Sequence, residues 1–452
     1  MPAKRAPWLA CDYHARMDLL RPVVKPYAWG STDAIAGLQG RAVPAPGPEA
    51  ELWMGAHPSG PSGIGADGLT LDKLIAADPE RELGPDCVDR FGPRLPFLLK
   101  VLSAAKALSI QVHPSRAQAQ TGFRAERDLA PDDPGRNYVD DWPKPELLCA
   151  LTPFEVAAGL RTPADAAALL RALGIRRLDP LTATLDAAPP LLAAPTPAAA
   201  GERAMADALA AILEWPAADR SALVDDVTAA CARLAAAGGP YAAACAAVVR
   251  VAAEHPRDLG AVALLLMRHA VLEPGQAVFM PAGGLHAYLR GTGIELLANS
   301  DNVVRAGLTG KHLDVPELLK LLDPAVEVPI HAPRVISDGI SWYDTPAPEF
   351  RLYNIDLTTE PLALPGTGPR VLLCLHGTAT LHASSAGPQH ATLHASSGPP
   401  HTSQHASSGG TLELSRGESC FASAVDGSLH ATGPARLILA TPGLAPPHDS
   451  PS

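Results

Sequence analysis

The chain has 452 residues, 47% of them hydrophobic, so its length fits two to four domains with sizeable cores. Its formal net charge is −11 and it contains no long basic run, which argues against a nucleic-acid partner. The seven cysteines include no CxxC pair, the early apolar piece is too short for a signal segment, and no apolar run reaches the length of a membrane span. We therefore expect a cytoplasmic protein with free thiols that binds neither nucleic acid nor a membrane.

Residues 20–160 have a pattern typical of β-strands, in which short apolar runs alternate with Gly, Pro, Asn and Asp clusters. An apolar run at 95–108 leads directly into the sequence SIQVHP. Alternate side chains of a strand point to opposite faces, so Ser109, Gln111 and His113 share one face, away from the isoleucine and valine between them. Three polar groups beside a buried strand need partners, which can be a hydrogen-bond network, a metal or a ligand.

The composition changes at about residue 162, where Ala-rich runs carry apolar residues at three- and four-residue spacing. This spacing predicts helices. The first helix, at 162–174, has Thr162 as N-cap, Pro163 in its first turn and Gly174 at its end. Further helices are predicted at 201–215, 221–239 and 241–255, and the Pro/Ala-rich stretch 188–199 is predicted to be a linker. We interpret this region as a helical insertion.

The β pattern returns at 272 and, after one short helix at 314–323, continues from about 345 to the end. Asp314 is the expected N-cap of that helix, and Glu317 completes a D-x-x-E capping box. Residues 382–410 contain HASS three times and are rich in Ser, Gly, Pro and His. A His-rich tract can bind metal, but we interpret this stretch as a low-complexity surface loop.

A further histidine occurs in the turn motif G-x5-P-x-G-x2-H, which runs from Gly275 to His286. A strand ending, a glycine turn and a returning strand would aim this histidine inward. The spacing is similar to the second motif of the cupin superfamily, whose β-barrels hold one metal, although Arg290 stands where cupins have asparagine. Two imidazoles, one carboxylate and one amide oxygen form a set that suits zinc with an open position, with Mn²⁺, Co²⁺ and Fe²⁺ as alternatives. The candidate ligands are Gln111, His113, Glu146 and His286.

Five blocks of the sequence resemble, in order and across about residues 20–330, the type I mannose-6-phosphate isomerase (phosphomannose isomerase) family. They read YAWGS, AELWMGAHPSGPS, LPFLLKVLSAAKALSIQVHP, KPELLCALTPFE and MPAGGLHAYLRGTGIELLANSDNVVRAGLTGKHLDVPELL. The resemblance implies a zinc-dependent aldose–ketose isomerase, with one zinc ion per chain. It would interconvert D-mannose 6-phosphate and D-fructose 6-phosphate through an enediol(ate) and feed mannose and GDP-mannose metabolism. We expect a monomer whose partner is a small sugar phosphate.

The resemblance also implies a mainly β fold with an inserted α-helical domain, that is, two cupin-like (jelly-roll) β-barrels plus a helical domain. We expect the catalytic cupin-like domain at 1–160 and 270–335, the helical domain at 161–269, and a metal-free cupin-like domain at 336–452. In that last domain, counting from Gly417 as from Gly275 places Ser428 where the first barrel has a histidine.

An aldose–ketose isomerase moves a proton between adjacent carbons, so it needs a base near the carbons and positive charge near the oxygens. The resemblance makes Arg305 the catalytic arginine of the family. Glu295 and Asp301 are both candidates for the base or for an orienting carboxylate, and the sequence does not choose between them. Lys144 shares a face with Glu146 in an extended chain and is a further catalytic candidate.

The phosphate of the substrate needs donors, for which Ser109, Lys100 and Lys311 are the candidates; Lys100 stands in an apolar strand, where an unpaired lysine would be costly. Trp29 and Tyr288 are candidates for the sugar pocket. One departure from the family pattern is Pro143, since the family often has histidine before the Lys-Pro-Glu sequence, which puts any mechanism that needs this histidine in doubt.

Two other functions compete with the isomerase. A non-catalytic cupin that binds a sugar phosphate would keep the pocket without the chemistry, but it would not need the Arg305, Glu295 and Lys311 set. An iron-dependent cupin oxygenase is disfavoured by the glutamine ligand and by the neighbouring cations. A bifunctional isomerase/nucleotidyltransferase is disfavoured because the first hundred residues contain no Gly-rich nucleotide loop.

Overall fold

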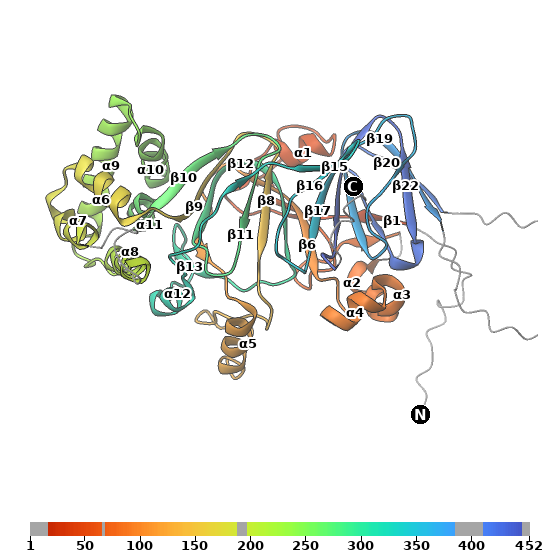
Figure 1. Ribbon diagram of the computed structural model, residues 1–452, viewed down its shortest axis with the longest axis horizontal. Helices are drawn as coiled ribbons and strands as arrows, with labels where there is room; N and C mark the ends of the chain where they lie inside the picture. Colours follow the sequence, from red (N-terminus) through yellow and green to blue (C-terminus); the bar gives the residue numbers. More distant parts are fainter. Residues whose placement is uncertain (1–16, 66–67, 188–196, 385–409, 445–452) are drawn as a thin grey trace, which may run out of the picture.

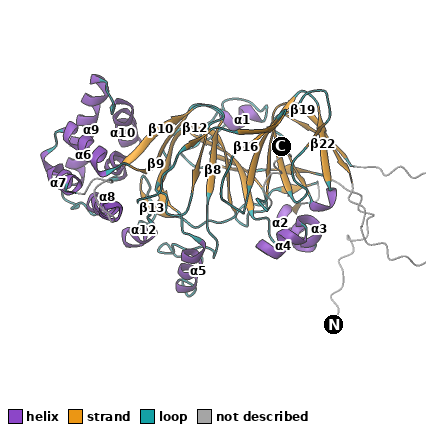
Figure 2. Ribbon diagram, in the orientation of Figure 1, coloured by secondary structure: helices purple, strands orange, loops and turns teal. Residues whose placement is uncertain are grey.

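The computed structural model describes residues 17–65, 68–187, 197–384 and 410–444. Helices gather at one end of the molecule, and strands fill its middle and its other end (Figure 1). Figure 2 shows the same division by colour, with three short helices packed under the strands near the far end. The amino-terminal segment, most of the predicted linker at 188–199 and most of the predicted loop at 382–410 lie outside the described residues.

Two antiparallel sheets contain the described strands. The eleven-stranded sheet comprises β2 (Val23–Lys25), β3 (Glu51–Met54), β6 (Phe97–Ala104), β7 (Ile110–Val112), β8 (Glu146–Ala150), β9 (Phe154–Leu160), β10 (Met267–Leu272), β11 (Ala277–Met280), β12 (His286–Ala298), β13 (Val304–Gly307) and β14 (Ile330–His331). The twelve-stranded sheet comprises β1 (Asp18–Arg21), β4 (Gly63–Ile64), β5 (Leu69–Thr70), β15 (Arg334–Ser337), β16 (Ile340–Trp342), β17 (Arg351–Asp356), β18 (Leu362–Ala363), β19 (Arg370–Ser384), β20 (Thr411–Ser415), β21 (Ser419–Ala422), β22 (Ser428–Thr432) and β23 (Ala435–Thr441).

One long strand organises each sheet, because its two halves have different neighbours. Residues 291–298 of β12 pair with β6 and β8, whereas its first residues pair with β7 and β9. In the same way, β19 pairs first with β21 and β23 and then with β20 and β22. Among the described strands, these pairings form branched paths that do not close into a ring. The fold is therefore a mixture of helices and two antiparallel sheets rather than mainly β, and the two expected cupin-like barrels are not confirmed.

The helices predicted from caps and spacing are present. Between β9 and β10 lie α6 (Pro163–Leu173), η2 (Arg176–Leu178), α7 (Asp179–Asp186), α8 (Pro197–Leu213), α9 (Arg220–Ala237), α10 (Ala242–Glu254), α11 (Gly260–Ala263) and η3 (Leu264–Leu266). The other helices are α1 (Ala34–Leu38), α2 (Leu71–Ala77), α3 (Pro79–Leu83), α4 (Pro85–Phe91), α5 (Arg116–Ala125), α12 (Val315–Leu321) and η4 (Ala424–Asp426). Thr162 accepts a hydrogen bond from the Asp165 amide, and Gly174 takes a left-handed φ of +68° at the end of α6.

The cap of α12 differs in part from the prediction. Asp314 accepts a hydrogen bond from the amide of Glu317, as expected for an N-cap. The Glu317 carboxylate instead accepts hydrogen bonds from the Tyr138 hydroxyl and from Lys320. The second half of the predicted capping box is thus replaced by a tertiary contact, which the sequence pattern around the helix does not reveal.

A shared apolar core joins the two sheets. Alternate residues of β3, β6, β8 and β12 point into it and meet alternate residues of β19, β21 and β23; examples are Leu52, Leu99, Leu147, Leu296, Leu373, Phe421 and Ile438. A second core fills the space between the helices and the outer side of β7, β9 and β12. Because one face of the eleven-stranded sheet is committed to the shared core, the intervening residues of the same strands face the opposite way.

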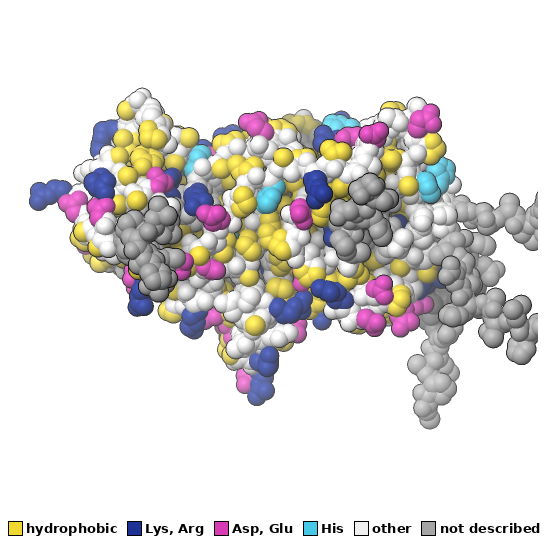
Figure 3. Space-filling model, in the orientation of Figure 1, with side chains coloured by type: hydrophobic (Ala, Val, Ile, Leu, Met, Phe, Trp, Pro, Cys, Tyr) yellow, Lys and Arg dark blue, Asp and Glu magenta, His cyan; other side chains and the backbone are white. Residues whose placement is uncertain are grey.

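On the surface shown in Figure 3, Lys and Arg side chains are scattered among Asp and Glu rather than gathered into one area. None of the helices that the structure describes combines the length and the hydropathy needed to cross a bilayer.

Candidate active site

Strand alternation brings four charged residues onto the face of the eleven-stranded sheet that is turned away from the shared core. They are Glu51 on β3, Lys100 on β6, Glu146 on β8 and Glu295 on β12, and each alternates with leucine or valine that enters the core. Lys100 stands directly opposite Glu295 in the register of β6 and β12. All four are buried, and they line one cavity of about 740 Å³.

Three of the predicted metal ligands converge at one end of this face. His113 follows β7, and Glu146 and His286 are the first residues of β8 and β12. The Glu146 Oε1 atom lies 3.2 Å from His113 Nε2, and its Oε2 atom lies 3.3 Å from His286 Nε2. The ligand atoms lie within 4.8 Å of one another, and all three residues are buried. Gln111 adjoins them, with its amide nitrogen 3.2 Å from His286 Nε2.

The backbone fixes which nitrogen of each imidazole faces the carboxylate. His113 Nδ1 lies 2.8 Å from the carbonyl oxygen of Asn302, and His286 Nδ1 lies 3.0 Å from that of Gly284. A proton on each Nδ1 satisfies these carbonyls and leaves lone pairs on both Nε2 atoms. Burial lowers the pKa of His113 to about 4, so its ring is neutral near pH 7, and its Nε2 makes no hydrogen bond. Two nitrogen lone pairs therefore face a carboxylate with no proton between them, which is the arrangement that a divalent cation satisfies.

Two further side chains hold Glu146. Lys144 Nζ lies 3.0 Å from its Oε1 atom, and the Tyr288 hydroxyl donates to Oε2 at 3.4 Å. Burial would raise the pKa of Glu146, but opposing effects, of which the charge of Lys144 is the largest, outweigh burial and hold that pKa well below its ordinary value. Glu146 is therefore an anion at neutral pH, as a metal ligand must be.

A buried ion cluster lies beside the metal ligands. Lys100 Nζ is 2.9 Å from Glu295 and 3.8 Å from Glu51, and the Trp53 indole nitrogen donates to Glu51 at 2.7 Å. Burial lowers the pKa of Lys100, but Glu295, Glu51 and Glu146 more than offset this and raise it above its ordinary value. The ammonium group is thus charged and engaged by protein carboxylates.

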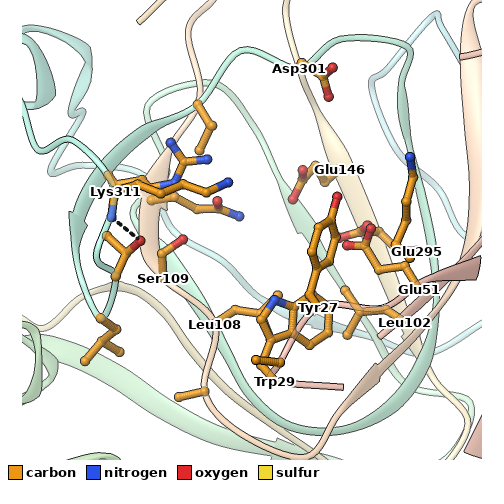
Figure 4. Close-up of a pocket in the computed structure, with 18 of the residues that line it drawn as sticks. Tyr27, Trp29, Glu51, Leu102, Leu108, Ser109, Glu146, Glu295, Asp301 and Lys311 are labelled. Atoms are coloured by element: carbon orange, nitrogen blue, oxygen red, sulfur yellow. Dashed lines mark hydrogen bonds between the residues drawn. The ribbon is translucent and has the colours of Figure 1, made fainter. Parts of the chain in front are cut away.

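Asp301 lies across the cavity from this cluster (Figure 4). Its Oδ2 atom accepts a hydrogen bond of 2.9 Å from the Ser59 hydroxyl, and its Oδ1 atom lies 3.4 Å from His57 Nε2. The side chain of Asp301 is 37% exposed, compared with 4% for that of Glu295. Of the two carboxylates proposed from the sequence, Asp301 is therefore the more accessible to a molecule in the cavity.

The opposite wall of the cavity carries Ser109 and Lys311 (Figure 4), together with Thr309 and Arg305. Arg305 stands opposite Gln111 in the pairing of β13 with β7, which places it next to the candidate metal site. Burial lowers the pKa of Arg305 from its high ordinary value, against the opposing charge of Asp301. This wall therefore offers cationic and hydroxyl groups to an anion.

The end of α10 also reaches the cavity wall. Glu254 accepts a hydrogen bond of 2.8 Å from the Ala107 amide, and His255 Nε2 lies 3.0 Å from the Ala107 carbonyl oxygen. Ala107, Glu254 and His255 all line the cavity. These contacts fix the backbone two residues before Ser109.

The structure thus brings the predicted site residues together. Those that line the cavity are Trp29, Lys100, Ser109, Gln111, Lys144, Glu146, Glu295, Asp301, Arg305 and Lys311. His113, His286 and Tyr288 do not line it and are fully buried beside Glu146.

Several residues at the site were not selected from the sequence, among them Glu51, Trp53, Tyr27 and His57. Glu51 and Trp53 alternate with apolar Leu52 and Met54, so the same period-two pattern that identified Ser109 and Gln111 could have found them. Tyr27 lines the cavity with its hydroxyl turned toward Glu146 (Figure 4), and it follows a proline in an irregular segment. His57 lies in a loop between Gly and Pro residues, where no periodic pattern marks it.

Comparison with known proteins agrees with this geometry. Residues 17–163 match the model of the phosphomannose isomerase type I catalytic domain. The chain is 34% identical to mannose-6-phosphate isomerase of Salmonella typhimurium over 431 residues, which cover 93% of this chain and 98% of the relative. It is 33% identical to mannose-6-phosphate isomerase of Rattus norvegicus over 390 residues, covering 81% and 88% of the two chains.

The chain belongs to the type I phosphomannose isomerase family. A solved structure of this family, mannose 6-phosphate isomerase bound with zinc and yttrium, has a TM-score of 0.77 and 31% identity, with 95% of this chain and 100% of that chain covered. Because the matches extend through nearly the whole chain, the similarity to the family covers the helical region and the twelve-stranded sheet as well as the cavity.

Proposed function

We propose that the protein is a zinc-dependent mannose-6-phosphate isomerase that interconverts D-mannose 6-phosphate and D-fructose 6-phosphate. The observation that carries this proposal is the pair of imidazole lone pairs aimed at one buried carboxylate beside a cavity with a cationic wall. Membership of a family whose relatives are mannose-6-phosphate isomerases supports the same substrate.

Gln111, His113, Glu146 and His286 would hold the zinc ion. Their chemistry fits zinc, because one carboxylate, two imidazoles and one amide oxygen form a mixed nitrogen and oxygen donor set. When bound, the ion would supply positive charge that polarises the two substrate oxygens. Lys144 contacts Glu146 and lines the cavity, so its ammonium group would orient the carboxylate and donate to a substrate hydroxyl.

We assign to Asp301 the transfer of the proton between the two adjacent carbons of the sugar. In the forward direction Asp301 would accept the proton from C2 of the open-chain aldose and return it to C1. The proton on O2 moves to O1 in the enediol, and Arg305 beside Gln111 would stabilise the negative charge that develops on these oxygens. Glu295 is a poorer base, because Lys100 engages it at 2.9 Å and its side chain is 4% exposed.

Ser109 and Lys311 would bind the phosphate, since they lie on the wall opposite Glu295 and offer a hydroxyl and an ammonium group (Figure 4). Lys100, the third phosphate candidate from the sequence, is held by Glu295 and Glu51, and we assign it to fixing these carboxylates. Trp29 lines the cavity and would pack against the sugar, whereas Tyr288 would act through Glu146.

The domain organisation and setting follow the same proposal. Residues up to 160 and 270–335 would form a cupin-like catalytic unit, 161–269 a helical unit, and the residues from 336 onward a second β unit without metal. The described cysteines are free and buried, which suits a reducing cytoplasm where a monomer would feed GDP-mannose synthesis.

Metal analysis combined with a coupled isomerase assay, before and after chelation, tests the proposal. We expect one zinc ion per chain, loss of turnover on chelation and recovery on adding zinc back. His113→Ala and His286→Ala should lose zinc and turnover together. His382→Ala, which changes an exposed residue of β19, should lose neither. Binding of sugar phosphate without turnover would point to a non-catalytic binding protein, and oxygen consumption with iron would point to an oxygenase.

A further inference from the structure

His57 is a buried imidazole that the proposed reaction does not use. It follows β3, is 3% exposed, and packs edge-on against Trp53 with ring centroids 4.9 Å apart. Its Nδ1 atom accepts a hydrogen bond of 3.1 Å from the Ser59 amide. Since a neutral imidazole carries one N–H, this contact places the proton on Nε2, the nitrogen that faces Asp301.

The Asp301 carboxylate is held at both oxygens. His57 Nε2 lies 3.4 Å from Oδ1, and the Ser59 hydroxyl donates to Oδ2 at 2.9 Å. The backbone amide of Asp301 donates to Asp140 at 2.9 Å, which anchors the residue itself. Lys25 donates to the Ser59 carbonyl oxygen at 2.7 Å and so fixes the loop that carries both donors.

Both side chains that contact the Asp301 carboxylate here, His57 and Ser59, are neutral groups. Burial lowers the pKa of His57 to about 4, since burial together with Lys100, Lys144 and Lys25 outweighs the opposing charge of Asp301. A neutral donor orients a carboxylate without forming a salt bridge that would stabilise its ionised form more strongly. Glu295 shows the contrast, because its partner at 2.9 Å is the ammonium group of Lys100.

We propose that His57 is a positioning residue for catalysis, whose Nε2–H fixes the Asp301 carboxylate in the orientation that reaches the sugar carbons. Ser59 completes the clamp on the second oxygen. This inference rests on the proposed function, in which Asp301 is the base. It adds that the base depends on His57, a donor from the loop after β3. His57 is far from Asp301 in sequence and is not one of the proposed metal ligands.

Three variants test the clamp in the zinc-loaded full-length protein. His57→Ala removes the imidazole N–H, and His57→Gln places an amide N–H near the position of Nε2. Ser59→Ala removes the second donor at an exposed position. The measurements are kcat, KM, bound zinc, thermal midpoint and the rate of solvent deuterium incorporation into the substrate, which reports proton transfer at carbon.

We expect His57→Ala to lower kcat and deuterium incorporation about 10- to 100-fold, with KM changed less than about threefold. His57→Gln should recover at least about fivefold of that loss, and Ser59→Ala should lower kcat about tenfold or less. Zinc content should equal that of the parent in all three variants. A merely structural role would lower the thermal midpoint without the selective change in kcat.

Two results would overturn the inference while leaving the proposed function intact: parental kcat in His57→Ala, or a folded, zinc-loaded His57→Gln that is no faster than His57→Ala. A parent protein that contains zinc but neither isomerises mannose 6-phosphate nor incorporates deuterium would instead overturn the proposed function, and the inference with it.

Discussion

Residues 275–298 of the eleven-stranded sheet and residues 417–432 of the twelve-stranded sheet follow the same order of elements. Gly275 and Gly417, with φ of +88° and +82°, precede β11 and β21, and a short turn then leads into β12 and β22. His286 begins β12, and Ser428 begins β22. The sequence count that aligned these residues therefore corresponds to an alignment of elements in the structure.

The side chains at the two turns differ in kind. The first turn lies beside three residues with lone-pair donor atoms, His113, Glu146 and His286. Under the second turn lies Arg370, fully buried, whose guanidinium donates to the carbonyl oxygens of Gly366 and Gly427 at 2.8 Å. The first arrangement presents donor atoms that suit a cation, whereas the second already contains a cationic side chain, that of Arg370. The shared backbone plan thus does not determine chemistry; the side chains placed on it do.

Substituting the charged residue at the centre of each arrangement, Glu146 or Arg370, should give the largest contrast in metal content and activity. Glu146→Ala should lose bound zinc and lower kcat/KM at least about 10³-fold, because the anion that pairs with the cation is gone. Arg370→Met should shift the thermal midpoint but leave kcat of the folded protein within about twofold, because no cavity residue contacts it. Metal content, kcat/KM and calorimetry check both variants, and a loss of zinc in Arg370→Met would refute the contrast.

Removing Lys100 tests how much the buried ion cluster on the polar face of the eleven-stranded sheet contributes to stability. Lys100→Met leaves Glu295 and Glu51 buried without their cation, which should lower the free energy of unfolding by about 3–5 kcal/mol. Chemical denaturation measures the change. Lys320→Met removes an exposed ion pair with Glu317 and should leave the free energy of unfolding almost unchanged, because water screens this pair. Equal effects of the two substitutions would contradict this prediction.

Glu82 should make the stability of the protein depend on pH. It lies on α3, which packs against η4 beside the twelve-stranded sheet. Burial raises its pKa to about 7, against the nearby charge of Arg81. The native state keeps a proton that the unfolded chain releases above about pH 4.5, so stability should fall as the pH rises from 4.5 to 7 and remain lower above it. The contribution is about 3 kcal/mol at most.

Glu82→Gln mimics the protonated side chain and should remove this dependence. Its thermal midpoint should exceed that of the parent at pH 8.5 and match it near pH 4.5, with kcat unchanged. Differential scanning calorimetry at both pH values checks the prediction. A variant that is less stable than the parent at pH 8.5 would show that ionised Glu82 is tolerated in the native state.

Substituting the two turn glycines, Gly275 and Gly417, should give the smallest difference, which is a difference in stability between two alanine variants. An alanine Cβ at Gly275 would meet no atom within 4 Å, so Gly275→Ala should cost only the left-handed backbone strain, about 1–2 kcal/mol. At Gly417 the Cβ would lie 2.6 Å from the Leu38 carbonyl oxygen, so Gly417→Ala should cost at least about 1 kcal/mol more. Thermal unfolding of both variants measures this difference, and a larger cost at Gly275 would contradict it.

Local patterns in the sequence predicted the local parts of the site. Period-two alternation placed Gln111 and His113 on one face, and the glycine turn placed His286 at the start of a strand, because both patterns depend only on neighbouring residues. The partner of Lys100 was not predictable in this way, since Glu295 comes from a strand nearly 200 residues later whose register is set by the whole sheet.

The two predicted cupin-like β-barrels were not confirmed for a related reason. Composition and spacing identify strands, but they do not say that the two halves of β12 or β19 take different neighbours, and this choice decides whether a sheet closes. The same limit applies to His57, because its role depends on Asp301, a residue that only the folded chain brings to it.

The contacts of Glu254 and His255 with Ala107 have a consequence for protein engineering. Because the last turn of α10 is bonded to the backbone that leads to Ser109, its length and angle are part of the substrate pocket. Peptide insertions or fusions at the α9–α10 connection should be carried without loss of turnover, whereas a single residue added after Glu254 should displace the cavity wall. The helical region should thus tolerate insertions at the α9–α10 connection but not at the end of α10.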